Sequence, residues 1–202
     1  MTSKGANQHQ QIFDQFAARV LRRLQIPAEE IETLKQFTRL KEVPRKSHVL
    51  NHGDKWDKFY FIHSGILRMF YIDLEGRDFN KAFFGEGQCI WPVAPMDRNN
   101  GVLFNVAVIP KTILLECEFT PLHEFLKQRG KWEEFALPFA ERLVETKFQR
   151  EHDFLLLPAA ERYENLLKAY PAFIDRIPDY HLASFLGITN VSLSRLKKSQ
   201  NF

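Results

Sequence analysis

The chain has 202 residues and a mass of 23.8 kDa, enough for one large domain or two modest ones that fold without metal or disulfide staples. Hydrophobic residues make up 45% of the sequence and charged residues 26%, a composition that excludes a disordered chain and is typical of a soluble globular protein. The formal net charge of +3 permits nucleic-acid binding but does not require it, because affinity for phosphates depends on where the cations cluster.

Cysteine usage and simple motifs exclude several further classes. Cys89 and Cys117 are far apart and have no histidine at ligand spacing, so we expect neither a disulfide framework nor a thiolate metal site. The polar start MTSKGANQHQQ lacks the apolar core of a signal peptide, and no run of about 18 apolar residues follows. We therefore expect a cytoplasmic protein without a membrane partner. No HExxH, GxSxG or CxxC motif is present, so we expect no enzyme activity.

The first part of the chain predicts helices followed by strands. Apolar residues at helical spacing predict a helix over about 11–24, and Pro27 then begins a second helical piece that runs toward Phe37. From Thr38 onward, short extended runs separated by turn residues predict a compact antiparallel β barrel or sandwich. The segment Asp73-Leu74-Glu75-Gly76 predicts a hairpin turn within it, with the glycine at positive φ.

Helical patterns return in the second half. Thr120 and Pro121 predict a helix start, with the threonine as the cap. Because proline interrupts helices, we expect a short turn before Pro138 and a long helix over about 138–155. Its apolar residues mostly recur every three or four positions, so one face needs a partner. That partner is the β domain of the same chain, the same helix in a second chain, or both, and the last two arrangements predict a homodimer.

The segment YHLASFLGITNVSLSRLKK, residues 180–198, predicts two short helices joined by a glycine turn. Gly187 lies where the chain must turn, and Thr189 is placed to cap the second helix. The buried side of that helix would carry Val191 or Leu193, together with Leu196. Such pairs are common in ordinary helical cores, but residues 190–202 contain three cations and no acidic residue. This excess of positive charge favours a helix pair that binds DNA over one that is only exposed to solvent.

The order of these elements resembles the Crp/Fnr family of bacterial transcription regulators. The resemblance rests on the runs FYFIHSGILRMF and FFGEG, and most specifically on ERYENLL, ASFLGIT and SLSR. It implies an α+β fold: an N-terminal antiparallel β barrel of the double-stranded β-helix or jelly-roll type with flanking helices, a dimerisation helix and an all-α helix-turn-helix domain. The implied domains are a sensor at 1–157 and a DNA-binding domain at 158–202. The implied partners are DNA, a second copy and RNA polymerase.

The resemblance also identifies where an effector would bind, and there the sequence departs from the cyclic-nucleotide binders. Their ribose-binding glutamate falls near Pro92, and their phosphate-binding arginine and serine fall near Phe104 and Asn105. A buried phosphate without a guanidinium would be poorly solvated, so we expect no tight binding of cyclic AMP. An effector of unknown identity would contact the remaining rim, although the aromatic residues there are more often simple core: Phe84, Gly85, Glu86, Gly87, Trp91, Arg98, Phe104, Asn105 and Phe148.

In the last helix the resemblance assigns base or phosphate contacts to seven residues: Asn190, Val191, Ser192, Ser194, Arg195, Lys197 and Lys198. A guanidinium can bridge the O6 and N7 acceptors of guanine, so Arg195 is the main candidate for reading a base. The sequence ends at Phe202, whereas many members of the family continue, so we expect modest DNA affinity. The alternative is an effector-sensing or protein-interaction module whose helix pair no longer binds DNA.

Overall fold

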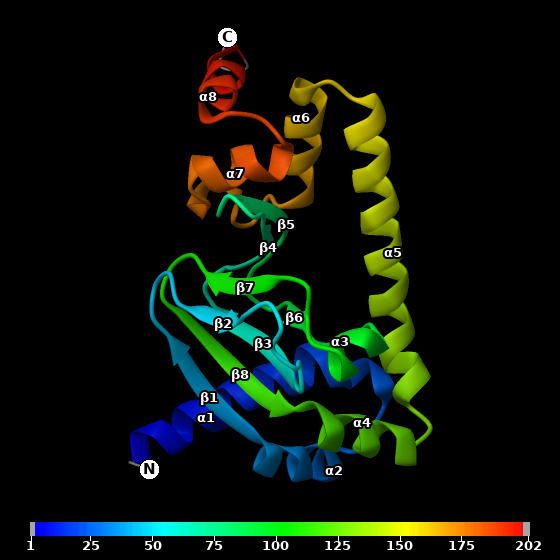
Figure 1. The fold of residues 1–202 in the computed structure, drawn as a ribbon. Coiled ribbons are helices and arrows are strands. Elements are labelled where there is room, and N and C mark those ends of the chain that lie inside the picture. Colours follow the sequence, from blue (N-terminus) through cyan, green and yellow to red (C-terminus); the bar gives the residue numbers. More distant parts are fainter. Residues whose placement is uncertain (1–2, 200–202) are drawn as a thin grey trace.

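The computed structural model describes residues 3–199, and its N-terminal segment is helical (Figure 1). Helix α1 (Ser3–Phe16) continues into a π-helical turn (Ala17–Leu21) and a 3-10 turn (Arg22–Leu24). The helix predicted over 11–24 therefore begins earlier than predicted, and its last eight residues are π-helical and 3-10 instead of α-helical. Pro27 then caps α2 (Ala28–Glu32), which is followed by a 3-10 turn.

Eight strands form two four-stranded antiparallel sheets, in the orders β1-β8-β3-β6 and β2-β7-β4-β5. The strands are β1 (Thr38–Val43), β2 (His48–Leu50), β3 (Lys58–Ser64), β4 (Leu67–Ile72), β5 (Asp78–Phe84), β6 (Cys89–Ile90), β7 (Asn105–Val108) and β8 (Thr112–Glu118), with the short helix α3 (Pro95–Asn99) between β6 and β7. The sheets pack face to face, and within the described residues no closed ring of paired strands joins them. The β domain is therefore a sandwich, the second of the two predicted forms.

Strand β3 explains why one sheet is covered on both sides. Successive side chains of a strand point to opposite faces. Tyr60 and Ile62 pack between the sheets, whereas Phe59 and Phe61 pack against the helices around α1. All four side chains are at least 97% buried, which is why this strand is a nearly continuous hydrophobic run rather than an alternating one.

The hairpin between β4 and β5 has the predicted turn. Gly76 has φ +78°, and its N–H donates to the carbonyl of Asp73 at 3.1 Å. The Asp73 carboxylate accepts from the backbone N–H groups of Glu75 and Arg77, both at 2.9 Å. A residue that can adopt left-handed backbone and an aspartate that caps the turn thus fix the hairpin locally.

Two predictions about helix starts are wrong. Helix α4 (Phe119–Gln128) begins two residues earlier than predicted, so Thr120 lies inside it and Glu118 precedes it. Helix α5 (Trp132–Leu156) runs through Pro138 without a break. The proline lies in the second turn, where it costs one backbone hydrogen bond, and the packing of Phe135 and Phe139 on Trp91 on either side of it holds the helix in place.

The C-terminal helices pack on the second sheet. Helices α6 (Ala159–Ala169), α7 (Asp179–Leu186) and α8 (Asn190–Ser199) surround a core that also contains Phe83 of β5. Figure 1 shows α5 running along one side of the molecule, from the helices below the sheets to the C-terminal helices above them. Within residues 3–199, no helix is long and apolar enough to cross a membrane. The end of the cationic segment, 200–202, lies outside the described residues.

Candidate nucleic-acid interface

Helices α7 and α8 form the predicted pair, and the turn between them is fixed by Gly187. The glycine has φ +68°, and the N–H of Ile188 donates to the carbonyl of Ala183 at 3.0 Å, the long-range bond of a Schellman cap. A Cβ at this position would lie 2.8 Å from Cε1 of Phe154, a residue of α5. The turn therefore requires glycine for its backbone conformation and for its contact with the long helix.

The second helix begins as predicted at Thr189, whose Oγ1 accepts from the N–H of Ser192 at 3.1 Å. Leu193 is fully buried, whereas Val191 is 61% exposed. Of the two alternatives for the buried side, the structure thus has Leu193. Leu193 packs α8 against α7, and the opposite side of α8 is exposed.

Five of the seven candidate DNA contacts lie exposed on α8: Asn190, Val191, Ser194, Arg195 and Lys198. Ser192 and Lys197 are half-buried, and Lys197 forms an ion pair with Asp179 at the start of α7. Lys197 is therefore partly neutralised within the chain. Arg195 and Lys198 have no ion-pair partner in the part of the chain that the structure describes.

The predicted effector residues lie in three different surroundings. Trp91 is buried among aromatic rings beside Phe119, and Arg98 lies over the same Phe119 ring. Phe104 is packed between the sheets, and the side-chain oxygen of Asn105 accepts from the N–H of His52 at 3.0 Å. Phe84 packs against the same inter-sheet core, whereas Phe148 on α5 is 67% exposed. The structure does not bring these side chains together around one site.

The turn Gly85-Glu86-Gly87 faces the C-terminal helices instead of an effector. Both carboxylate oxygens of Glu86 accept from the Arg176 guanidinium, at 2.9 and 2.5 Å, and one also accepts from the N–H of Gly65. Burial alone would raise the pKa of Glu86, but the bonds from Arg176 and Gly65 outweigh it and lower that pKa. A Cβ on Gly85 would meet the Phe173 ring at 2.4 Å. This turn is thus an attachment point for the C-terminal helices.

Helix α7 is attached directly to strand β5. The Ser184 hydroxyl donates to the carbonyl of Asp78 at 2.6 Å and accepts from the N–H of Asn80 at 3.0 Å. The Asn80 amide donates to the carbonyl of His181 at 3.3 Å and lies 3.4 Å from its ring. Burial, with a smaller effect of Arg68, lowers the pKa of His181 to about 4. The attachment therefore requires a neutral imidazole.

We expect this attachment to weaken in acid. His181 has a pKa of about 4 in the folded protein and about 6.5 when unfolded. The unfolded chain therefore binds more protons in this interval, and stability present above pH 6.5 is lost as the pH falls toward 4, by roughly 3 kcal/mol. Urea unfolding of His181→Gln against the unchanged protein measures this, with the exposed His52→Gln as control. Equal pH dependence of His181→Gln and the unchanged protein would contradict the assignment.

Two arginines hold the C-terminal end of α7, and sequence reasoning missed both. Arg150 of α5 donates to the carbonyls of Asn80 and Phe185 at 3.1 and 3.0 Å. Arg162 of α6 donates to the carbonyls of Leu157 and Leu186 at 2.9 and 3.0 Å. The last carbonyls of a helix lack partners within it and carry partial negative charge, so cations stabilise them. The only sequence signal was the ERYENLL run, which the resemblance used without assigning Arg162 a contact.

No protein-family model matches the chain, and neither does any curated protein. Solved structures do match. The c-di-GMP-responsive global regulator CLP of Xanthomonas campestris is 15% identical with a TM-score of 0.66, covering 87% of this chain and 92% of that one. FixK2 of Bradyrhizobium japonicum is 16% identical (TM-score 0.65; 81% and 84% covered). A Crp/Fnr regulator of Eubacterium rectale is 11% identical (TM-score 0.67; 86% and 83% covered). The chain therefore has the fold of the Crp/Fnr regulators, with its cyclic nucleotide-binding-like β domain.

Proposed function

We propose that this chain is a homodimeric DNA-binding transcription regulator of the Crp/Fnr type. The observation that carries the proposal is the exposed face of α8, where Arg195 and Lys198 have no ion-pair partner among residues 3–199 while the buried Leu193 packs the helix against α7. Free cations on a rigid helix are what phosphate and base contacts require. The proposed sensor comprises residues 1–157 and the proposed DNA-binding domain 158–202, which meet between the end of α5 and the start of α6.

The sensor is proposed to lack the usual phosphate site of cyclic-nucleotide binders. Where their phosphate-binding arginine is expected, the Phe104 ring packs on Trp56 at 5.9 Å between centroids. Its neighbour Asn105 is occupied by the backbone of His52. The cation at the Phe104 ring is the Lys81 ammonium, 4.3 Å from the ring centroid, and an ammonium lacks the planar pair of donors with which an arginine holds a phosphate. This supports an effector other than cyclic AMP.

DNA binding is tested by fluorescence anisotropy with duplexes selected from a random library. The affinity of the unchanged protein is expected to fall as salt rises, because binding releases counterions from phosphates. Arg195→Ala is expected to cost about 1–3 kcal/mol on the selected site and to flatten discrimination at one base pair, whereas Lys198→Ala weakens all sequences alike. Lys168→Ala, exposed on α6, serves as the control. Salt-independent or absent binding would instead favour a module that no longer reads DNA.

Helix α5 supports the homodimer. Leu137, Val144, Phe148 and Leu155 recur at steps of seven and four residues and are 56%, 48%, 67% and 74% exposed. An exposed apolar stripe at this spacing is typical of a helix that pairs with a second helix. A twofold mate would cover the stripe with the same residues of its own chain.

Breaking this stripe is expected to separate the copies. Phe148→Glu places a charge in the middle of the proposed interface, and we expect it to weaken dimerisation at least tenfold in sedimentation equilibrium, because an unpaired charge is costly to bury. Lys147→Glu changes the neighbouring exposed residue and serves as the control. A dimer that persists in Phe148→Glu with unchanged affinity would contradict the proposed interface.

A further inference from the structure

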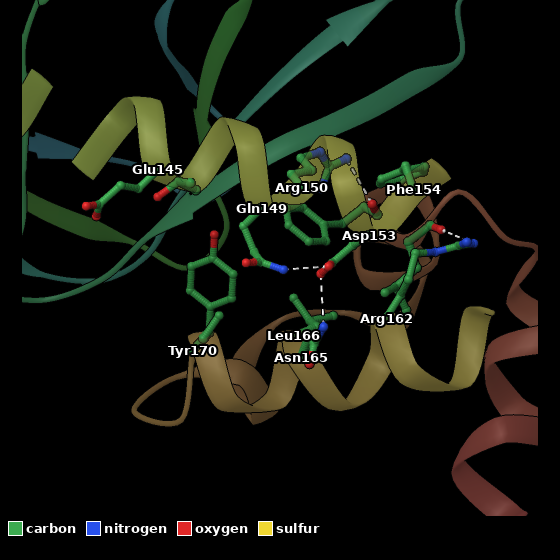
Figure 2. A pocket seen from close by; sticks show the side chains of 13 residues that line it. Glu145, Gln149, Arg150, Asp153, Phe154, Arg162, Asn165, Leu166 and Tyr170 are labelled. Carbon is green, nitrogen blue, oxygen red and sulfur yellow. Dashed lines mark hydrogen bonds between the residues drawn. The ribbon is translucent and has the colours of Figure 1, made fainter. Parts of the chain in front are cut away.

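A pocket of about 350 Å³ lies where α5, α6 and α7 meet (Figure 2). Its apolar wall includes Leu166, Tyr170 and Phe185, and its polar wall includes Gln149 and Asp153. This volume is within the usual range for small-molecule sites, and apolar walls with a few polar groups are typical of them.

The Asp153 carboxylate in the pocket is already hydrogen-bonded within the chain. Figure 2 shows Asp153 between two amides, and it accepts from Nε2 of Gln149 at 2.7 Å and from Nδ2 of Asn165 at 3.0 Å. His152 lies 3.2 Å from the same carboxylate. Burial would raise the pKa of Asp153, but these hydrogen bonds lower it, so the group is ionised and satisfied. It needs no cation from a ligand.

Arg150 and Arg162, the two arginines at the pocket, each have a nitrogen without a hydrogen-bond acceptor among the described residues. Nη1 of Arg150 and Nε of Arg162 are buried and have no hydrogen-bond acceptor within residues 3–199. Neither guanidinium lies in an ion pair with a carboxylate of those residues, and the carbonyls that they contact are neutral. Burial lowers the pKa of Arg150. Within the described chain, what these two nitrogens lack is a hydrogen-bond acceptor, and a charged acceptor is the strongest partner for a guanidinium.

Aromatic rings lie against both guanidinium groups: the Phe185 ring is 4.0 Å from the Arg150 guanidinium carbon, and the Phe154 ring contacts both arginines. The Phe154 ring lies 4.7 Å from the Arg150 guanidinium carbon and 5.0 Å from that of Arg162, and Phe154 is 41% exposed. Rotation of this ring toward solvent gives up both cation–π contacts and its packing on the Gly187 turn, so the bonds to an incoming acidic group must exceed that cost. Rotation would open the two buried N–H groups to an acidic group in the pocket.

The proposed dimer interface does not cover this pocket. At roughly 100° per residue around the helix, the pocket residues Thr146 and Asp153 lie about half a turn from Val144 and Phe148. A second copy packed on the exposed stripe would therefore approach α5 from the side opposite Thr146 and Asp153.

We propose that this pocket binds a small organic monocarboxylate whose apolar body packs on Leu166, Tyr170 and Phe185 and whose acid group pairs with Arg150 and Arg162. A carboxylate has two oxygens, one for each of the two nitrogens without an acceptor in the described part of the chain, Nη1 of Arg150 and Nε of Arg162. The walls also carry the carboxylates of Glu145 and Asp153, so the charged lining residues already sum to zero. The site therefore accepts one negative charge at most, and a polyphosphate would overfill it.

Three ligands with the same phenyl body and different charge test the proposal: phenylacetate, 2-phenylethanol and phenethylamine. In calorimetric titrations of the full chain we expect phenylacetate to bind at least tenfold more tightly than the other two, because only it pairs with the guanidinium groups. Phenethylamine binding as tightly as phenylacetate, or no phenylacetate binding up to about 10 mM, would overturn the proposal.

Two further measurements locate the site. Ala169→Phe adds a large side chain to the pocket lining and keeps both arginines, and it is expected to weaken phenylacetate binding at least tenfold. Lys168→Phe, at the neighbouring exposed position, is expected to leave that binding unchanged. In the unchanged protein, phenylacetate is expected to shift the NMR signals of the Gln149 and Asn165 side-chain amides. Binding that survives Ala169→Phe, or that leaves both amides unshifted, places the ligand elsewhere and overturns the proposal. None of these readouts involves DNA, so they are independent of the proposed function.

Discussion

Gly187→Val is expected to destabilise the packing of the C-terminal helices by about 2–6 kcal/mol. A residue held at φ +68° costs about 1–3 kcal/mol, and more for a β-branched side chain. The new Cβ also meets the Phe154 ring at 2.8 Å, and such overpacking costs about 1–3 kcal/mol. Urea unfolding followed by circular dichroism measures the loss, and DNA affinity should fall with it.

Gly130→Val is the matched control for this change. Gly130 has φ +62°, close to that of Gly187, but a Cβ there would have no atom of residues 3–199 within 4 Å. The control therefore carries the backbone strain without the contact with α5. If the two variants lose the same stability, the contact between the turn and Phe154 contributes nothing.

Arg150→Gln is expected to cost about 3–6 kcal/mol and to release α7 from strand β5. The variant loses two hydrogen bonds from a charged donor to the carbonyls of Asn80 and Phe185, each worth about 1.5–3 kcal/mol, and leaves both carbonyls buried. Hydrogen exchange should show faster exchange in α7, which depends on this anchor, than in strand β8, which does not contact it.

The control for the arginine is on the same helix. Arg142 is exposed, and its replacement by glutamine is expected to change the free energy of unfolding by less than about 0.5 kcal/mol. A similar loss in Arg142→Gln and Arg150→Gln would mean that Arg150 acts through the helix and not through its bonds to α7 and β5.

The features that the sequence predicts correctly are those fixed by neighbours along the chain. The hairpin at Asp73 to Gly76 needs a turn-capping aspartate and a glycine, and both are local. The same holds for the glycine turn at Gly187 and the cap at Thr189. The helix break before Pro138 was wrong because contacts with Trp91, distant in the sequence, outweigh one lost hydrogen bond.

The features that the sequence does not predict depend on contacts across the fold. Glu86 was predicted to contact an effector, because nothing near it in the sequence indicates its hydrogen bond with Arg176, 90 residues away. Arg150 was given no role from the sequence, since its partners lie on β5 and α7. The exposed residues of α8 were predictable from helical spacing, but the engagement of Lys197 by Asp179 was not.

Strand β5 is the outermost strand of its sheet, so one row of its backbone groups has no neighbouring strand to pair with. The Ser184 hydroxyl and the Arg150 guanidinium occupy that row, at the carbonyl of Asp78 and at the N–H and carbonyl of Asn80. Removing the last three helices would uncover a strand able to recruit another β-chain. The contacts that attach α7 to β5 thus also protect the sandwich from aggregation through this edge.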